Sequence, residues 1–202
     1  MYDFKKAFLH TKTVLAHKKE VMRLASYAGI SWQGFTHDLS KFCPSEFLES
    51  VKYCNGIESP IRTCRKETGK SEAWLYHKSR NKHHWEWWVD DLIHGGKGVA
   101  MPYKYALEMA IDIIAANRVY AKDEWTPDML KNYWAEHRKE IIVHPQTLRF
   151  LDSIFRDYIQ FGVEALKPEK TLVKYNISMN IEKRREIIRN RKTKYITVPM
   201  HN

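Results

Sequence analysis

The sequence predicts an all-α fold, on three observations. First, apolar residues recur at three- and four-residue spacing over long stretches, which is the period of an amphipathic helix. Second, few segments show the strict apolar–polar alternation of half-buried strands. Third, Gly29, Pro44 and Pro168 stand where such helices would end or begin.

The N-terminal third of the chain predicts three helices. The first is expected over residues 4–28, with Gly29 as its stop signal. Its apolar face consists of Phe4, Phe8, Val14, Val21, Leu24 and Ala28. A second helix, over residues 31–42, carries the doublet His37-Asp38, and Pro44 opens a short third helix to about residue 53.

The middle of the chain is less regular. Residues 55–70 are expected to form a loop, because they contain two Gly and one Pro. Residues 71–80 are expected to be helical, residues 81–91 give no clear backbone signal, and residues 93–102, with three Gly, are expected to form a flexible loop. Further helices are expected over 103–121, 126–142 and 146–165.

Composition sets limits on the class of protein. The chain has 202 residues, 44% hydrophobic and 29% charged, which is typical of a globular protein. Its net charge of +10 favours anionic partners such as nucleotides, phosphoesters, nucleic acid or an anionic membrane surface, without choosing among them. With no apolar run of transmembrane length and no signal-peptide pattern, we expect a cytoplasmic protein with no membrane partner.

Cysteine usage argues against a disulfide framework. Cys43, Cys54 and Cys64 are an odd number without C-x-x-C spacing, so free thiols are the expectation. The sequence gives no indication of the oligomeric state.

The domain organisation is read from Pro168. We expect a helical domain over residues 1–167 and a basic C-terminal tail over residues 168–202. Residues 183–194 contain seven Lys and Arg against Glu186 alone. A solvated helix face is the plain interpretation of this run. Nucleic-acid binding is the alternative, although Tyr195 is the one aromatic beside the run that could stack on a base.

Metal-ligating side chains are the main indication of function. Imidazoles and carboxylates are the donors that hold divalent first-row metals, and no single helix can supply all of those found here. The candidate ligands are His17, His37, Asp38, His77, His83, His84 and Asp112. The domain 1–167 is therefore expected to bind one or two divalent ions, with Mn, Fe, Co, Mg or Zn all open.

Each candidate has a structural alternative. His17 faces the apolar side of its helix, where a lone His is usually a satisfied core residue. Asp38 could cap a helix, with His37 exposed and Lys41 forming a simple i,i+3 ion pair. Alternatively, Lys41 could lean toward a substrate phosphate beside the metal.

The aromatic segment around His83 and the helix around Asp112 give further support to a metal site. His77, His83 and His84 are crowded among four Trp, which indicates either a buried hydrogen-bonded cluster or a metal pocket with a dry wall. Asp112 lies on an apolar helix face, where an unpaired carboxylate costs several kcal/mol unless a cation meets it. A metal ion or Arg118 would satisfy it.

These residues resemble the pattern of the HD-domain superfamily of metal-dependent phosphohydrolases. The resemblance places a His at His17, the His-Asp doublet at His37-Asp38 and the distant Asp at Asp112, and the segment through Lys41 looks like a His-Asp-x-x-Lys core. It implies an HD-like helical bundle, to which the basic residues 168–202 form a C-terminal appendage. The additional His residues resemble members that hold two or more metals.

A narrower resemblance covers about residues 5–167. The run from His37 to Trp88, and residues 108–112 with Ala115 and Ala116, are similar to segments of an uncharacterised bacterial and phage family, which implies no activity. The chain also departs from the cyclic-dinucleotide phosphodiesterase branch, because Trp85-Glu86, rather than a Gly-rich Tyr-Pro segment, follows the His-His pair. Glu86 could still serve as a ligand or a base.

The resemblance implies a metal-dependent phosphohydrolase acting on a nucleotide or other small phosphoester through a metal-bound water. Lys41 and Arg118 would offset phosphate charge. One alternative is a non-haem di-iron oxygenase on the same ligands. The other is a non-enzymatic basic binding protein that uses residues 183–194.

Overall fold

The computed structural model describes residues 3–90 and 98–196, with side chains up to residue 189. Within these residues it is all-α, as predicted, with no strand. The α-helices are α1 (Phe4–Tyr27), α2 (Ser31–Thr36), α3 (Pro44–Lys52), α4 (Pro60–Thr68), α5 (Glu72–Arg80), α6 (Tyr103–Ala121), α7 (Pro127–His137), α8 (Pro145–Phe161) and α9 (Pro168–Ile196). Short 3₁₀ segments are η1 (Leu39–Phe42), η2 (Trp85–Trp88), η3 (Lys122–Glu124) and η4 (Gly162–Leu166).

The hydrophobic core surrounds α6, which packs against α1, α7, α8 and α9. The fully buried residues Leu107, Ile111 and Ile114 of α6 belong to one cluster with Phe150 and Ile154 of α8. Burial of this apolar surface is the main stabilising term. One result is that α6 is a rigid support for any polar side chain on its remaining face.

The α1–α2 crossing depends on a glycine. A Cβ atom added to Gly34 would stand 2.6 Å from the Cβ of Ala25, so only glycine allows α2 to lie this close to α1. Lys18 of α1 then donates hydrogen bonds to the carbonyls of Phe35 and His37, at 2.7 and 2.9 Å. These contacts hold the end of α2 over the middle of α1.

Two predicted segments were wrong. The helix predicted over residues 31–42 ends at Thr36, because Asp38 has a left-handed backbone with φ of 54°, and the His-Asp doublet therefore lies in a connection. The loop predicted over residues 55–70 contains α4. Pro60 begins this helix, and Gly69, with φ of 77°, ends it, so the residues that suggested a loop act as its boundaries.

The later helices end earlier than predicted. The helix expected over 126–142 ends at His137. The one expected over 146–165 ends at Phe161, where Gly162 takes a positive φ of 61° and η4 follows. The loop predicted over 93–102 falls partly on residues 91–97, which lie outside the described residues, as do residues 197–202 of the predicted tail.

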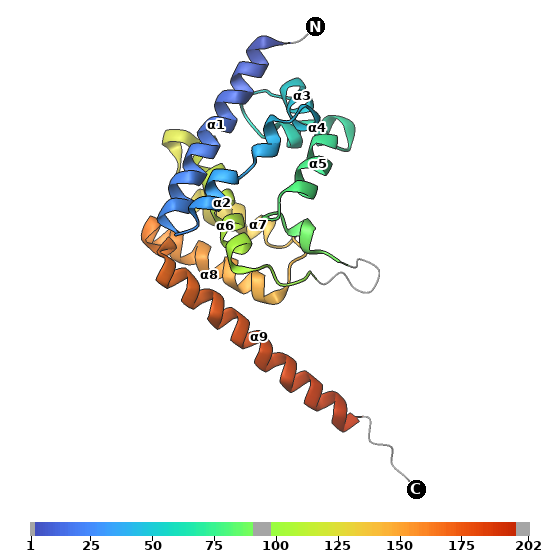
Figure 1. Cartoon of the computed structure of the whole chain (residues 1–202), viewed down its shortest axis with the longest axis vertical. Coiled ribbons are helices and arrows are strands. Elements are labelled where there is room, and N and C mark those ends of the chain that lie inside the picture. The colour runs from blue at the N-terminus through green and yellow to red at the C-terminus, as the bar shows by residue number, and fades with distance from the viewer. Residues whose placement is uncertain (1–2, 91–97, 197–202) are drawn as a thin grey trace.

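The last helix, α9, begins at Pro168 and packs on the body along its first half. Thr171 and Ser178 are buried, and the Tyr175 hydroxyl donates to the carbonyl of Met101 at 2.9 Å. Beyond Glu182 the described side chains are exposed, and α9 extends away from the other helices (Figure 1). None of the described helices is both long and apolar enough to cross a membrane.

Candidate metal centre

Asp38 stands at the centre of a buried polar cluster. It lies between α2 and η1, with φ of 54° and ψ of 25°, a conformation that costs a non-glycine residue roughly 1–2 kcal/mol. Strain of this kind tends to persist where function requires a particular side-chain direction. Here this conformation turns the Asp38 side chain toward the interior, and Asp38 is only 3% exposed.

One oxygen of Asp38 meets a first group of donors. His37 Nε2 lies 3.3 Å from Asp38 Oδ2, and it lies 3.4 Å from Asp112 Oδ1. His17 Nε2 lies 3.0 Å from the same Asp112 oxygen and 3.3 Å from His37 Nε2. The structure therefore brings together four residues from α1, the α2–η1 connection and α6 that could hold one metal ion.

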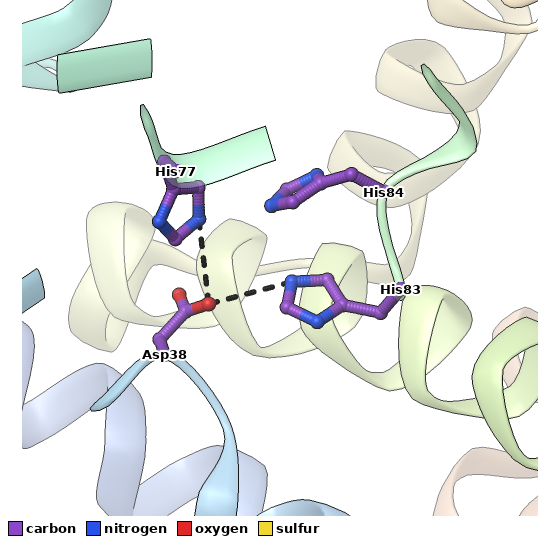
Figure 2. A group of neighbouring side chains, drawn as sticks. All are labelled: Asp38, His77, His83 and His84. Carbon is purple, nitrogen blue, oxygen red and sulfur yellow. Dashed lines mark ion pairs between the residues drawn. The ribbon is translucent and has the colours of Figure 1, made fainter. Parts of the chain in front are cut away.

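The other oxygen of Asp38 meets a second group. His77 Nε2 and His83 Nε2 lie 3.3 and 3.4 Å from Asp38 Oδ1. Figure 2 shows both rings directed at this carboxylate, with the His84 ring beside them. Asp38, His77, His83 and His84 also form a group that could hold a metal ion, so Asp38 is common to both groups.

The spacing of these atoms fits ligands around an ion. Ligand atoms that stand 2.0–2.2 Å from one ion at angles of about 90–110° lie about 2.8–3.6 Å from one another. The Nε2-to-oxygen distances of 3.0–3.4 Å given above fall within this range. The donors are therefore already at the separation that a shared ion would require.

Unsatisfied lone pairs support the same fit. Within the described residues, Asp38 Oδ1 and the Nε2 atoms of His83 and His84 are buried without a well-directed hydrogen bond, whereas Asp38 Oδ2 has the Lys41 ammonium at 2.6 Å. Buried polar atoms nearly always have a partner. A divalent cation accepts electron pairs from carboxylates and neutral imidazoles alike, so an ion in the second group would satisfy Asp38 Oδ1 and both imidazole nitrogens.

Two glutamates that are not among the predicted site residues hold the histidine rings. Glu108 Oε1 accepts from His37 Nδ1 and from His83 Nδ1, each at 3.1 Å. Glu46 Oε2 accepts from His77 Nδ1 at 2.8 Å. A ring that donates through Nδ1 presents its Nε2 lone pair inward, as in the carboxylate–histidine–metal arrangement of many metal sites.

The charges within the cluster are strongly coupled. Although burial opposes ionisation, His37 and Lys41 hold the pKa of Asp38 well below its usual range. Burial likewise opposes the charged form of His37, yet the carboxylates of Asp38 and Asp112 raise its pKa well above the ordinary value. The acidic side chains thus favour a cation at their centre, and a metal ion would take the place of the His37 proton.

His84 and His17 are held neutral. Burial, and then the neighbouring His83 and His77, lower the pKa of His84 well below its usual value. Burial also lowers the pKa of His17, although its hydrogen bond to Asp112 opposes this shift. Neutral imidazole is the form that binds metals.

The three predicted catalytic residues lie in different places. Lys41 Nζ lies 2.6 Å from Asp38 Oδ2, at the cluster. Glu86 is half-buried in η2, and burial raises its pKa, but it belongs to none of the metal-capable groups among the described residues. Arg118 pairs instead with Glu20 at 2.9 Å and lies over the Trp125 ring, so the structure does not bring it to Asp112 as expected.

The fold and the cluster define an all-α protein with a buried His/Asp site that could hold a metal ion. The chain belongs to DUF5662, a family of unknown function, whose model matches residues 6–157. Neither the curated proteins nor the solved structures gave a match. The family match does not extend to an HD-domain family, so the resemblance to that superfamily stays a hypothesis.

Proposed function

We propose that this protein is a metal-dependent phosphohydrolase that acts on a nucleotide or another small phosphoester. The observation that carries the proposal is the pair of donor groups joined through Asp38, with the Lys41 ammonium beside them. A bound divalent ion would lower the pKa of a water on it and so supply a nucleophile near neutral pH. His17, His37, Asp38 and Asp112 would hold one ion, and Asp38 with the other three histidines a second.

We expect a substrate to reach the cluster from the side of Asp112 and Lys41. Their side chains are 19% and 25% exposed, whereas those of His37, His77 and His83 are at most 3% exposed. A phosphoester that enters from this side meets the Lys41 ammonium. Because a cation placed where negative charge develops stabilises the transition state, Lys41 would contribute directly to turnover.

Metal analysis followed by an activity screen tests the proposal. The protein is purified without added metal or chelator and its metal content is measured. It is then assayed on nucleoside mono-, di- and triphosphates and on a chromogenic diester, with Mn²⁺, Co²⁺, Mg²⁺, Zn²⁺ and Fe²⁺ in turn. We expect bound divalent metal and release of phosphate or alcohol. Absence of cleavage with every metal would contradict the proposal, and iron-dependent oxygen uptake would favour the oxygenase alternative.

A second candidate function, nucleic-acid binding, is supported by the charge on the far half of α9. Residues 183–194 carry +6 of the net charge of +10, and the described side chains at 183–189 are exposed on every face of the helix. The phosphate backbone binds such charge with a strong salt dependence.

The test is the fluorescence anisotropy of a labelled duplex with increasing salt. Neutralising two exposed residues, by Lys183→Gln with Arg184→Gln, should weaken binding and flatten the salt dependence by about two charges. A control variant, Lys12→Gln with Lys19→Gln, makes the same charge change on exposed positions of α1. Equal effects of the two pairs, or no duplex binding by the unaltered chain, would contradict this candidate function.

A further inference from the structure

Glu108 contacts both donor groups of the candidate metal centre. It lies on α6, one turn before Asp112, and is only 6% exposed. Its single oxygen Oε1 accepts from Nδ1 of His37 and from Nδ1 of His83, at 3.1 Å each. The two rings, 46 positions apart in the sequence, have their centroids 4.4 Å apart. One carboxylate oxygen therefore orients two rings that come from distant segments.

The two rings serve different groups. His37 Nε2 faces Asp38 Oδ2 and Asp112 Oδ1, at 3.3 and 3.4 Å. His83 Nε2 faces Asp38 Oδ1 at 3.4 Å and lies farther, 3.8 Å, from Asp112 Oδ2. Because Glu108 fixes the Nδ1 side of each ring, it fixes the direction of one Nε2 lone pair in each group. If either ring turned, Glu108 would have to move or lose a hydrogen bond, and the other ring would lose its alignment.

Glu46 provides a contrast within the same structure. Its Oε2 holds His77, which belongs to one group only, and also accepts from the Ser40 hydroxyl at 3.1 Å. Glu46 and Glu108 are both buried carboxylates that accept from histidine Nδ1 atoms. They differ in that Glu108 contacts histidines of both groups. Comparing the two glutamates therefore distinguishes an effect on both groups from the orientation of a single ring.

We propose that Glu108 is a positioning residue that couples the two metal sites, so that its charge and geometry set the affinity for both ions. This inference rests on the proposed metal binding. An ion bound in one group would fix Glu108 through its histidine and so preorganise the histidine of the other group. The two ions should therefore bind with positive cooperativity.

The experiment is a calorimetric titration of the metal-stripped full chain with Mn²⁺, repeated with Co²⁺. The unaltered protein should bind two ions. Glu108→Gln should weaken both binding steps, about 10–100-fold each, as loss of an outer carboxylate typically does. Glu46→Gln should weaken one step and leave the other unchanged. No binding by the unaltered chain would contradict the proposed function itself.

Other outcomes would overturn the coupling role while the metal centre stands. One such outcome is that the unaltered protein binds two ions and Glu108→Gln weakens only one binding step, or neither. Another is three ions in the unaltered protein and two in Glu108→Gln, which would make Glu108 a direct ligand. His37, His83 and Glu108 could form such a third group.

A spectroscopic readout keeps the inference testable if Glu108→Gln folds poorly. In protein loaded with diamagnetic Zn²⁺, the Nδ1 protons of His37 and His83 should give downfield resonances, since both donate to one carboxylate. Glu108→Asp, which keeps the charge and shortens the side chain, should shift both resonances together. A shift of one without the other would overturn the shared role. The His77 resonance, whose partner is Glu46, is the internal reference.

Discussion

Lys41 Nζ lies 2.6 Å from Asp38 Oδ2, within one turn of η1. Burial opposes the charge on this ammonium, yet Asp38 and then Asp112 raise its pKa above the ordinary value. Lys41 is therefore a permanent cation at the accessible side of the centre. It is also paired with the one residue common to both donor groups, so under the proposed function it would meet a phosphate beside the candidate ligands.

Replacing Lys41 should separate turnover from metal binding. We expect Lys41→Ala to keep its metal content, because Asp38 loses a competitor for its lone pairs. Turnover of the phosphoester should fall about 10²–10³-fold, the usual effect of removing one preorganised charge contact. Metal analysis and steady-state kinetics check this, with Lys12→Ala, an exposed lysine of α1, as the control. Loss of metal in Lys41→Ala would assign Lys41 to structure instead.

Asp38→Asn should remove bound metal while the backbone is kept. Asn tolerates the left-handed conformation that Asp38 adopts, so the connection between α2 and η1 can keep its shape. The amide lacks the charge that both groups share, and we expect the metal content to fall below one ion per chain and hydrolysis to be abolished. Elemental analysis checks this against Asp123→Asn, an exposed aspartate. A folded Asp38→Asn with unchanged metal would contradict the bridging role.

Much of the fold was accessible from the sequence because helical periodicity is a local property. The helix predicted over 103–121 coincides with α6, and the one over 4–28 exceeds α1 by one residue. The helix α4 is not predicted because Pro and Gly occur in loops as well as at helix ends, and here Pro60 lies in the first turn and Gly69 at the C-terminal end. The left-handed backbone of Asp38 is not evident in the sequence, because the helical residue pattern over 31–42 continues through this position without a break.

The site was predictable in its ligand types and less so in its supporting residues. The structure brings the seven predicted residues together around Asp38. Their order along the chain, with His and Asp on separate segments, was a sufficient signal to predict the group. Glu108 could have been found, since it lies four residues before Asp112 and so on the same helix face. Glu46 could not, because its role depends on the packing of α3 against α5. The position of Arg118 was not predictable for the same reason, because it depends on a tertiary ion pair with Glu20.

Metal removal should lower the thermal stability of the protein. A ligand that binds only the folded state at about 100 times its Kd adds about 2.7 kcal/mol, which for a chain of this size is about 5–10 °C in Tm. We expect chelation to lower Tm by this amount and re-addition of Mn²⁺ or Co²⁺ to restore it, as followed by circular dichroism. Asp38→Asn should show no such response. An unchanged Tm of the unaltered protein on chelation would argue against a bound ion.

His10 should make the protein sensitive to mild acid, independently of the metal. It is buried on α1, its Nε2 atom has no hydrogen-bond partner among the described residues, and its ring lies 5.4 Å from that of Phe47. Burial, and then the charge of Lys41, lower its pKa from 6.5 to about 4. The unfolded chain therefore takes up this proton first as the pH falls below 6.5. The contribution of neutral His10 to the free energy of unfolding is therefore complete above pH 6.5 and is lost as the pH falls toward 4.

The variant His10→Phe should reduce this acid sensitivity. Each pH unit within the window changes the free energy of unfolding by up to about 1.4 kcal/mol per proton, so His10 should cost about 2 kcal/mol at pH 5. We would measure urea unfolding of both proteins at pH 7.5 and 5.0 with chelator present, so that the remaining histidines contribute equally to both. The stability lost between these pH values should be smaller in His10→Phe by about 2 kcal/mol. Equal losses in the two proteins would show that His10 is protonated as easily in the folded chain as in the unfolded one.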